Sequence, residues 1–226
     1  VSPGSVSGRF RKKRFRNCGR TWSSKTSVTN TDADGAPGEG VLRTGTGDDG
    51  TSGLLGGVRR SKDDPVFEAL GTVDEAQVAL GLCRALVTAS PSAQETSLSS
   101  DLLWVQQQLL RAGAGIACPS AAPRPSTLDI LTESQLSDIL SCFEGWRTMV
   151  TLPSVFVVSG DTLLGARLDW ARTVLRRAER RVVGLGSRTE GLKATVRFLN
   201  VAGDLLYLWA RWADQNPPGR PRSPVS

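Results

Sequence analysis

The 226-residue sequence contains no histidine, and none of its four cysteines belongs to a CxxC pair. These absences exclude a Cys/His structural zinc site, a cysteine–histidine nucleophile and a Ser-His-Asp triad. No apolar run approaches the roughly 20 residues that a membrane-spanning helix needs, and Arg211 interrupts the longest one, LLYLWARW. We therefore expect a soluble protein without a membrane partner, whose cysteines stay reduced.

Acidic residues are missing from the first 29 residues, which hold eight of the 28 basic ones. The chain has a formal net charge of +6, yet its remainder carries 20 basic against 22 acidic residues. The excess positive charge is thus confined to the N-terminal segment. A nearly neutral folded part does not indicate a nucleic-acid-binding groove, so no nucleic-acid partner is expected.

The length of the chain predicts one domain with tails. We expect a disordered basic tail over residues 1–40, a helical domain over 41–214 and a disordered C-terminal tail over 215–226. Arginine and serine without acids are typical of a mitochondrial transit segment, although RKKRFR fits equally a nuclear address or a solvated charge run. The hydroxylated residues favour the transit segment and thereby the mitochondrial matrix; without it we expect the cytoplasm.

Glycine, aspartate, threonine and serine dominate residues 31–60, which predicts a loop. Asp64 and Pro65 then provide the N-cap and first position of a helix that runs to about residue 87. A second helix is expected over about 98–116. Thr132 and Gln135 predict a capping box that opens the third helix.

The third helix is expected to bury Leu136, Ile139, Leu140, Phe143 and Trp146. A fourth helix starts after residue 161 and is ended by glycines at 184 and 186, and a fifth covers about 190–214. The stretch TLPSVFVVSGD, between the third and fourth helices, is the one segment with strand character. The pattern predicts an all-α fold, a five-helix bundle preceded by a Gly-rich loop.

The stretch VLRRAERRV in the fourth helix combines four arginines with one glutamate. At about 100° per residue, Arg172, Arg176 and Glu179 fall beside the apolar stripe, and Arg177 and Arg181 lie nearly opposite it. Arginines at the edge of a core either pair with acids or hold an anionic ligand, because a desolvated guanidinium without a partner is costly. Taken alone, the pattern favours a salt-bridge face with Glu179 and neighbouring acids.

Two further features indicate a phosphate ligand. Four polar residues share one face of the fifth helix: Arg197, Asn200, Asp204 and Arg211. A mid-helix asparagine is more often a ligand contact or a buried hydrogen-bond partner. The loop RTGTGDDGTSG can cradle phosphates with its backbone N–H groups, although a flexible linker explains it equally, and it lacks the P-loop motif GxxxxGKS/T. Together these features favour a polyphosphate such as ATP.

Four stretches carry a resemblance to a known family: TGTGDDGTSGLLGGVRRSKDDPVFEALGTVDEAQVALG, FVVSGD, ARTVLRRAERRV and RFLNVAGDLLYLWAR. In this order, over about residues 41–213, they resemble the ATP:cob(I)alamin adenosyltransferases of the trimeric five-helix-bundle type. The resemblance implies transfer of the 5′-deoxyadenosyl group of ATP to cob(I)alamin, which forms adenosylcobalamin and releases triphosphate. Because the cobalt is the nucleophile in this family, no side chain is needed as acid or base, in keeping with the absence of histidine.

The resemblance also implies roles for individual residues. Contacts to ATP are implied for Thr44, Gly45, Thr46, Gly47, Ser52, Lys62, Arg176, Arg177, Glu179, Arg180 and Asn200. Mg²⁺ would lie between the phosphates, with its protein ligands unassigned. Phe156 would keep the lower face of cobalamin free of an axial ligand, and Asp204 would help to position the substrates. Asp74 and Arg172 would form a salt bridge across the subunit interface of a homotrimer.

Five positions depart from the family pattern: Gly45 stands in place of a lysine, Gly53 of a serine, Ser159 of a proline, Asp169 of a histidine and Val201 of an arginine. These departures keep open a second hypothesis, a relative that binds ATP and cobalamin and acts as a cobalamin carrier. Hand-over to a cobalamin-dependent mutase is expected as the next step. A third hypothesis is a nuclear interaction module whose arginine-rich helix binds acidic partners.

Overall fold

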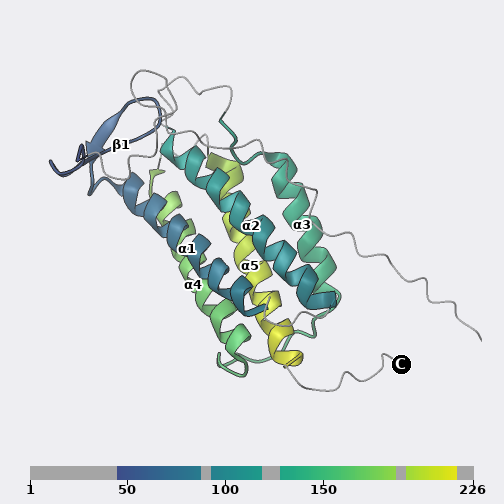
Figure 1. Ribbon diagram of the computed structural model, residues 1–226. Helices are drawn as coiled ribbons and strands as arrows, with labels where there is room; N and C mark the ends of the chain where they lie inside the picture. Colours follow the sequence, from purple (N-terminus) through teal and green to yellow (C-terminus); the bar gives the residue numbers. More distant parts are fainter. Residues whose placement is uncertain (1–44, 88–92, 119–127, 187–191, 218–226) are drawn as a thin grey trace, which may run out of the picture.

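The computed structural model describes residues 45–87, 93–118, 128–186 and 192–217 (Figure 1). Five helices make up these ranges, α1 (Pro65–Val87), α2 (Ala93–Ala117), α3 (Glu133–Arg147), α4 (Leu163–Val183) and α5 (Lys193–Gln215), after the short strands β1 (Thr51–Gly53) and β2 (Arg59–Ser61). Helix α1 packs against α2 and α4, and α5 packs against α3 and α4. The predicted all-α five-helix bundle is confirmed. The expected tail over 1–40 lies outside the described residues, as do residues 218–226 of the tail expected over 215–226, whereas Gln215 is the last residue of α5.

The helix starts follow the capping signals of the sequence. The backbone N–H of Val66 donates to Oδ1 of Asp64 at 3.0 Å, which caps α1 as expected. Thr132 and Gln135 form the predicted capping box of α3. Helix α2 begins at Ala93, five residues earlier than expected, because its polar first turn lacks the apolar residues that mark a buried stripe.

The core is formed by the inner faces of all five helices, with Trp209 and Phe198 of α5 among its largest fully buried side chains. The prediction that Leu140 of α3 is buried is wrong. Leu140 is 43% exposed, while Ile139 beside it is buried. Helix α3 packs mainly against α5, at one edge of the bundle. A helix with one main neighbour buries a narrow stripe, so the residue next to it faces outward.

The stretch TLPSVFVVSGD, expected as a short extended connection with strand character, forms no strand. Its residues Val155, Phe156 and Val158 are exposed. The segment expected as a loop instead contains an antiparallel hairpin in which Thr51 pairs with Ser61 and Gly53 with Arg59. Glycines with positive φ at 56 and 57 allow its tight turn.

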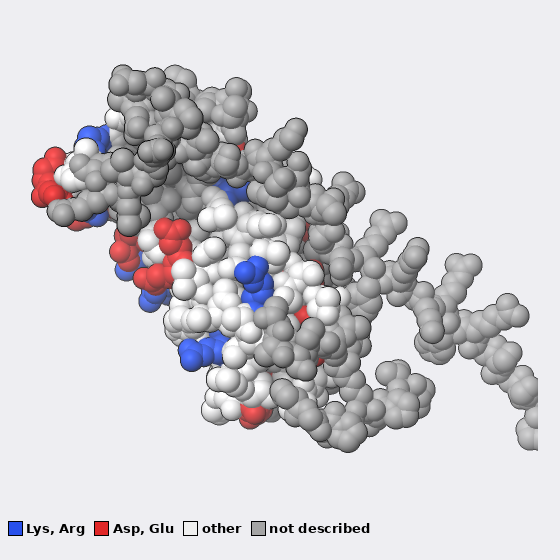
Figure 2. Space-filling model, viewed as in Figure 1, with Lys and Arg blue, Asp and Glu red and all other residues white. Residues whose placement is uncertain are grey.

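Charge is unevenly spread over the face that Figure 2 shows. Acidic and basic side chains gather together at the left of the view, around the hairpin and the start of α1, whereas the middle of the bundle is largely uncharged with a few basic groups. Exposed apolar residues on α1 and α2 include Val78, Leu82 and Leu110. Within the described ranges no helix has an apolar stretch sufficient to cross a membrane.

Candidate functional site

The Gly-rich hairpin lies at the end of the bundle where α1 begins and α2 ends. The backbone N–H of Leu55 donates to the carbonyl of Ala117 at 3.0 Å, which fastens the turn of the hairpin to the last residue of α2. Strand β2 leads through a short turn into α1, so the hairpin is fixed at both sides (Figure 1). A loop held in this way presents its backbone groups in a defined arrangement.

Two cations hold the loop before β1. Nζ of Lys62 donates to the carbonyl oxygen of Gly47 at 2.7 Å. The guanidinium of Arg59 donates to the carbonyl oxygen of Thr46 and to the hydroxyl of Thr51. A β-carbon on Gly47 would lie 3.2 Å from both Lys62 Nζ and the Thr51 carbonyl oxygen, so a side chain there would require these neighbours to shift by a few tenths of an ångström. The fold thus brings together Thr46, Gly47 and Lys62 from the predicted ATP contacts.

Three further residues of the loop region were expected to contact ATP: Thr44, Gly45 and Ser52. Gly45 has φ +71°, a conformation that favours glycine over the lysine expected there. Ser52 is half-buried in β1, and Thr44 lies outside the described residues. Hydrogen bonds from the hydroxyl and the backbone N–H of Thr51 hold the pKa of the Asp49 carboxyl below its usual value, with the charge of Arg59 adding to the effect.

The arginines of α4 divide between two sides of the helix. Arg177 forms an ion pair with Glu75 of α1, and Arg181 pairs with Glu68, one to two turns nearer the hairpin. Arg177 and Arg181, expected nearly opposite the apolar stripe, are both exposed, and the neighbouring helix α1 supplies the acids that pair with them. The acids that pair with them come from α1 rather than from Glu179, which shows why spacing within one helix could not identify the partners.

The other arginines of VLRRAERRV face solvent. Arg176 and Arg180 are exposed and form no ion pair within the described residues, and Glu179 is half-buried. Arg176, expected at the edge of the core, has an exposed side chain whose stem lies against α5, where a β-carbon on the buried Gly203 would be 3.6 Å from Arg176 Cγ.

Helix α5 contributes two exposed polar residues to the same neighbourhood. Asn200 lies one turn before Gly203 and Asp204 follows it directly, and both side chains are exposed. Arg197 on this face pairs with Glu133 of α3. The predicted polar face is therefore exposed from Arg197 to Asp204, but not at Arg211.

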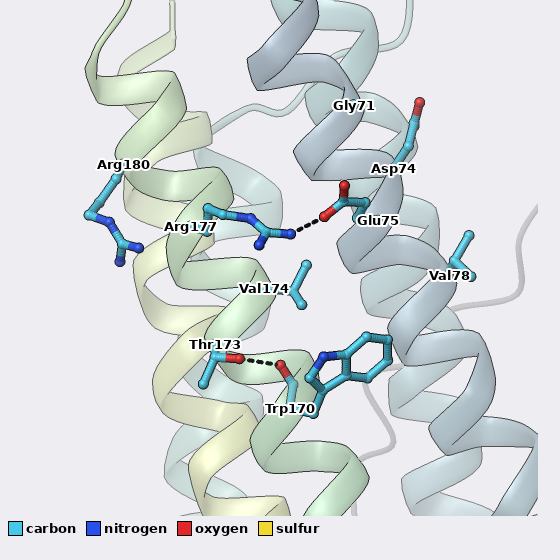
Figure 3. A pocket seen from close by; sticks show the side chains of 9 residues that line it. All are labelled: Gly71, Asp74, Glu75, Val78, Trp170, Thr173, Val174, Arg177 and Arg180. Carbon is cyan, nitrogen blue, oxygen red and sulfur yellow. Dashed lines mark hydrogen bonds and ion pairs between the residues drawn. The ribbon is translucent and has the colours of Figure 1, made fainter.

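A hollow of about 580 Å³ lies between α1 and α4 (Figure 3). Its walls are apolar at Val78, Trp170 and Val174, while Asp74, Glu75, Arg177 and Arg180 bring charges to it. Arg177 reaches toward Glu75 across the space between the helices, and Arg180 lies on the side of α4 away from α1. Partial burial raises the pKa of the Asp74 carboxyl, which has no cation partner within the described residues.

A second hollow, of about 390 Å³, lies under the segment between α3 and α4. Phe156 lines it and is fully exposed to solvent, unlike the other described phenylalanines. The opposite side is formed by Arg172, Tyr207 and Arg211. Both guanidiniums lie over the Tyr207 ring, with distances to its centroid of 5.5 Å from Arg172 and 5.1 Å from Arg211.

A buried ion cluster supports this second hollow. Arg211 is 4% exposed and its Nη2 lies 2.6 Å from Oδ2 of Asp169 and 3.0 Å from Oδ2 of Asp214. The hydroxyl of Thr162 donates to the other oxygen of Asp214. Asp169, where the family pattern has histidine, is therefore an ion-pair partner in the core. Sequence reasoning missed the cluster and Tyr207, although an arginine within an apolar run and the one tyrosine of the chain were signals for both.

Asp74 and Arg172 do not meet within one chain. Asp74 lines the hollow between α1 and α4, and Arg172 lines the hollow under Phe156. Nε of Arg172 is buried without a hydrogen-bond partner among the described residues. The predicted pairing of these two residues between subunits is compatible with this arrangement and stays a prediction.

The described residues contain no group of three or more Cys, Asp or Glu side chains that could hold a metal ion. The expected Mg²⁺ therefore has no preformed protein cage in these ranges. A magnesium ion that accompanies ATP is usually bound by phosphates and water with one or two carboxylates, and Asp48 and Asp49 of the loop are the nearest acids to Thr46 and Gly47 in the sequence.

Fold and site together define a helical-bundle protein with a Gly-rich hairpin and exposed arginines at one end. Its sequence matches the model of the family described as cobalamin adenosyltransferase over residues 42–213. The chain belongs to this family, which confirms the predicted resemblance.

Individual relatives agree with the family match. The chain is 35% identical to the corrinoid adenosyltransferase PduO of Salmonella typhimurium, over 78% of this chain and 50% of that protein. It is 33% identical to the corrinoid adenosyltransferase MMAB of Homo sapiens, over 76% of this chain and 68% of that protein. The chain thus spans about half the length of the PduO proteins of Salmonella typhimurium and Citrobacter freundii.

Solved structures support the same fold. A variant PduO-type ATP:corrinoid adenosyltransferase from Lactobacillus reuteri, with a phenylalanine replaced by alanine and complexed with cobalamin and ATP, superimposes with a TM-score of 0.69 at 28% identity. The match covers 77% of this chain and 93% of that one. An arginine-to-lysine variant complexed with ATP gives a TM-score of 0.67 at the same identity.

Proposed function

We propose that this protein is a transferase that moves the 5′-deoxyadenosyl group of ATP to cob(I)alamin and releases triphosphate. The observation that carries the proposal is the family match over residues 42–213, which spans the hairpin, α4 and α5 together. The match to the solved relative that is complexed with cobalamin and ATP covers 93% of that relative's chain. This coverage supports the same pair of substrates for the protein.

The exposed arginines support a role in binding the triphosphate of ATP. Arg176 and Arg180 lie on the half of α4 that is nearest the hairpin, because α1 and α4 run antiparallel and Arg181 pairs with Glu68 near the start of α1. A guanidinium can grip two phosphate oxygens at once. Thr46, Gly47 and Lys62 in the hairpin, with Asn200 on α5, would complete the contacts to ATP.

The reaction needs positioning and charge neutralisation rather than proton transfer. The electron pair of cob(I)alamin cobalt forms a bond to C5′ of ATP, and the C5′–O bond breaks so that its electrons leave with triphosphate. Residues that hold the leaving group therefore stabilise the charge that develops on it. Phe156, exposed over the second hollow, is the residue proposed to lie against the lower face of the corrin.

The direct test is incubation of the purified protein with ATP, Mg²⁺ and chemically reduced cobalamin. We expect adenosylcobalamin and triphosphate in equal amounts. Binding of ATP and cobalamin without product would instead support the carrier hypothesis, which the glycine at position 45 and the valine at 201 motivate. Absence of binding to both ligands would contradict both proposals.

We also propose that the protein is a homotrimer with an Asp74–Arg172 pair between subunits. Asp74 is partly buried without a cation, and Nε of Arg172 is buried without a partner among the described residues. The two groups lie in different hollows, so a pair between copies joins two different surfaces. Such heterologous contacts close into rings, of which a trimer is a small example.

Sedimentation tests the trimer. Wild-type protein at micromolar concentration is expected to have three times the mass of the chain, and Asp74→Arg, which places two cations at the contact, is expected to dissociate it. Asp74→Arg combined with Arg172→Asp reverses the charges and should restore the trimer. A monomeric wild-type protein would contradict the proposal.

The cellular location of the protein and the fate of its product are proposals that rest on the sequence. We propose that residues 1–40 direct the protein to mitochondria, because the basic, hydroxylated segment lacks acids there until Asp32. Fusion of this segment to a fluorescent protein tests the address, with Arg-to-Gln replacements as the control. Transfer of labelled adenosylcobalamin to an added cobalamin-dependent mutase would test the proposed hand-over.

A further inference from the structure

Two exposed arginine–glutamate ion pairs join α1 to α4. Arg177 pairs with Glu75, the two side chains being 45% and 59% exposed. Arg181 pairs with Glu68, at 54% and 56% exposed. The two pairs match in residue types, helices and exposure, but Arg177 alone of these four residues is proposed to contact ATP. The pairs therefore allow a comparison of an ion pair within the site with one outside it.

Arg177 is already neutralised by its own chain. In Figure 3 its guanidinium points away from Arg180 and toward α1, where it meets the Glu75 carboxylate. Asp74 precedes Glu75 and lines the same hollow, so two carboxylates border the space next to Arg177. A triphosphate that approached this guanidinium would meet the negative charge of Glu75 within a few ångströms.

From this arrangement we infer that Glu75 competes with the triphosphate group for Arg177 and thereby lowers the affinity of the protein for ATP and for the released triphosphate. The inference rests on the proposed function. Its physical basis is that one guanidinium cannot keep a full contact with the carboxylate while gripping phosphate oxygens, and that like charges held close together repel. Glu75 is thus a residue that sets ligand affinity through Arg177.

The size of the effect follows from the exposure of the pair. An ion pair between half-exposed side chains is weak, because water screens the charges and the side chains lose freedom when they pair. Removal of the competing charge is accordingly expected to tighten binding by about two- to fivefold. The affinities for ATP and for inorganic tripolyphosphate should increase by the same factor, because Glu75 competes with the phosphate groups and not with the nucleoside.

The variant that tests the inference is Glu75→Gln. Glutamine keeps an oxygen that can accept a hydrogen bond from Arg177 and removes the charge, so it separates competition from loss of orientation. Glu68→Gln is the matched control, because it changes the equivalent pair with Arg181. Titration calorimetry with Mg-ATP and with tripolyphosphate measures the affinities, and the melting temperature checks that both variants fold equally well.

A double-mutant cycle shows whether Glu75 acts through Arg177. In the background Arg177→Gln, which is expected to bind ATP more weakly, the further change Glu75→Gln is expected to have almost no effect on affinity. A direct repulsion between Glu75 and ATP, independent of Arg177, would leave the full gain in that background and would overturn the inference as stated.

The outcomes for the inference and for the proposed function can be told apart. Unchanged or weaker binding of ATP and tripolyphosphate by Glu75→Gln, with normal binding by the wild type, would overturn the inference and leave the proposed function intact. An equal gain in Glu68→Gln would also overturn it, by showing a general charge effect. A wild-type protein that binds no ATP would overturn the proposed function and the inference with it.

Discussion

Asp214, near the end of α5, occupies the space that a β-carbon on Gly165 would need. That carbon would lie 2.1 Å from Oδ1 of the carboxylate. The same carboxylate accepts a hydrogen bond from the hydroxyl of Thr162, which is the N-cap of α4. It also forms an ion pair with Arg211. The first turn of α4 and the last turn of α5 are therefore locked together by a contact that tolerates no side chain at Gly165.

Gly165→Ala is expected to destabilise the bundle by about 1–3 kcal/mol, because Asp214 must move away from Thr162 and Arg211. In an ordinary helix position the same substitution stabilises by about 0.5–1 kcal/mol. Gly113→Ala in α2 is the control, since its β-carbon would meet Leu70 at an ordinary 4.0 Å. Urea unfolding of both variants measures the difference, and a stabilised Gly165→Ala would contradict the packing described.

Arg211→Met is expected to cost about 3–5 kcal/mol, because it leaves the carboxylates of Asp169 and Asp214 buried without their cation. Arg197→Met removes an exposed pair with Glu133, whose side chains are 60% and 70% exposed. The cost of that control should stay below about 1 kcal/mol. Equal losses in denaturant unfolding would show that the cluster around Arg211 is not buried in solution.

Arg176→Ala and Arg180→Ala are expected to lower ATP affinity or transfer rate by roughly tenfold to a hundredfold, through loss of a charge-assisted contact to phosphate. Their melting temperatures should change little, because both side chains are exposed. Arg181→Ala, which removes the pair with Glu68, is the control that should spare ATP binding. A lowered melting temperature with normal affinity would assign Arg176 and Arg180 a structural role.

Phe156→Ala is expected to leave ATP affinity and folding nearly unchanged and to slow adenosyl transfer at saturating ATP by about tenfold or more. The side chain is fully exposed, so its removal takes no apolar surface out of the core. Val158→Ala is the control, since Val158 is 87% exposed in the same segment and does not line the hollow. Loss of ATP affinity with normal transfer would contradict the role of Phe156.

Asp74 should give the separated protomer a pH dependence of stability. Its pKa is raised in the folded chain, so the folded state binds more protons than the unfolded state above the usual pKa of 3.8. The associated stability is present below that pH and is lost as the pH rises through the raised pKa. Unfolding by urea at several pH values, at a concentration where single chains dominate, should show this fall, and Asp74→Asn should flatten it.

Much of the fold follows from local signals. Asp64, the Thr132–Gln135 capping box and the apolar periodicity determine where helices begin and which faces they bury, because capping and amphipathic burial depend on residues a few positions apart. The same signals predicted burial incorrectly where it depends on how many helices lie beside an element. Leu140 is exposed because α3 has a single main neighbour, α5.

The candidate site shows most clearly which features the sequence determined and which depended on the tertiary structure. The sequence by itself determined that Arg176 and Arg177 lie on one helix with a Gly-rich segment before it, and the motifs identified the family. The tertiary structure alone decided that Arg177 meets Glu75, 102 positions away in the chain, and that Arg211 is buried between Asp169 and Asp214. The physical reason is that ion pairs and burial between helices depend on how the helices pack, which no spacing within one helix specifies.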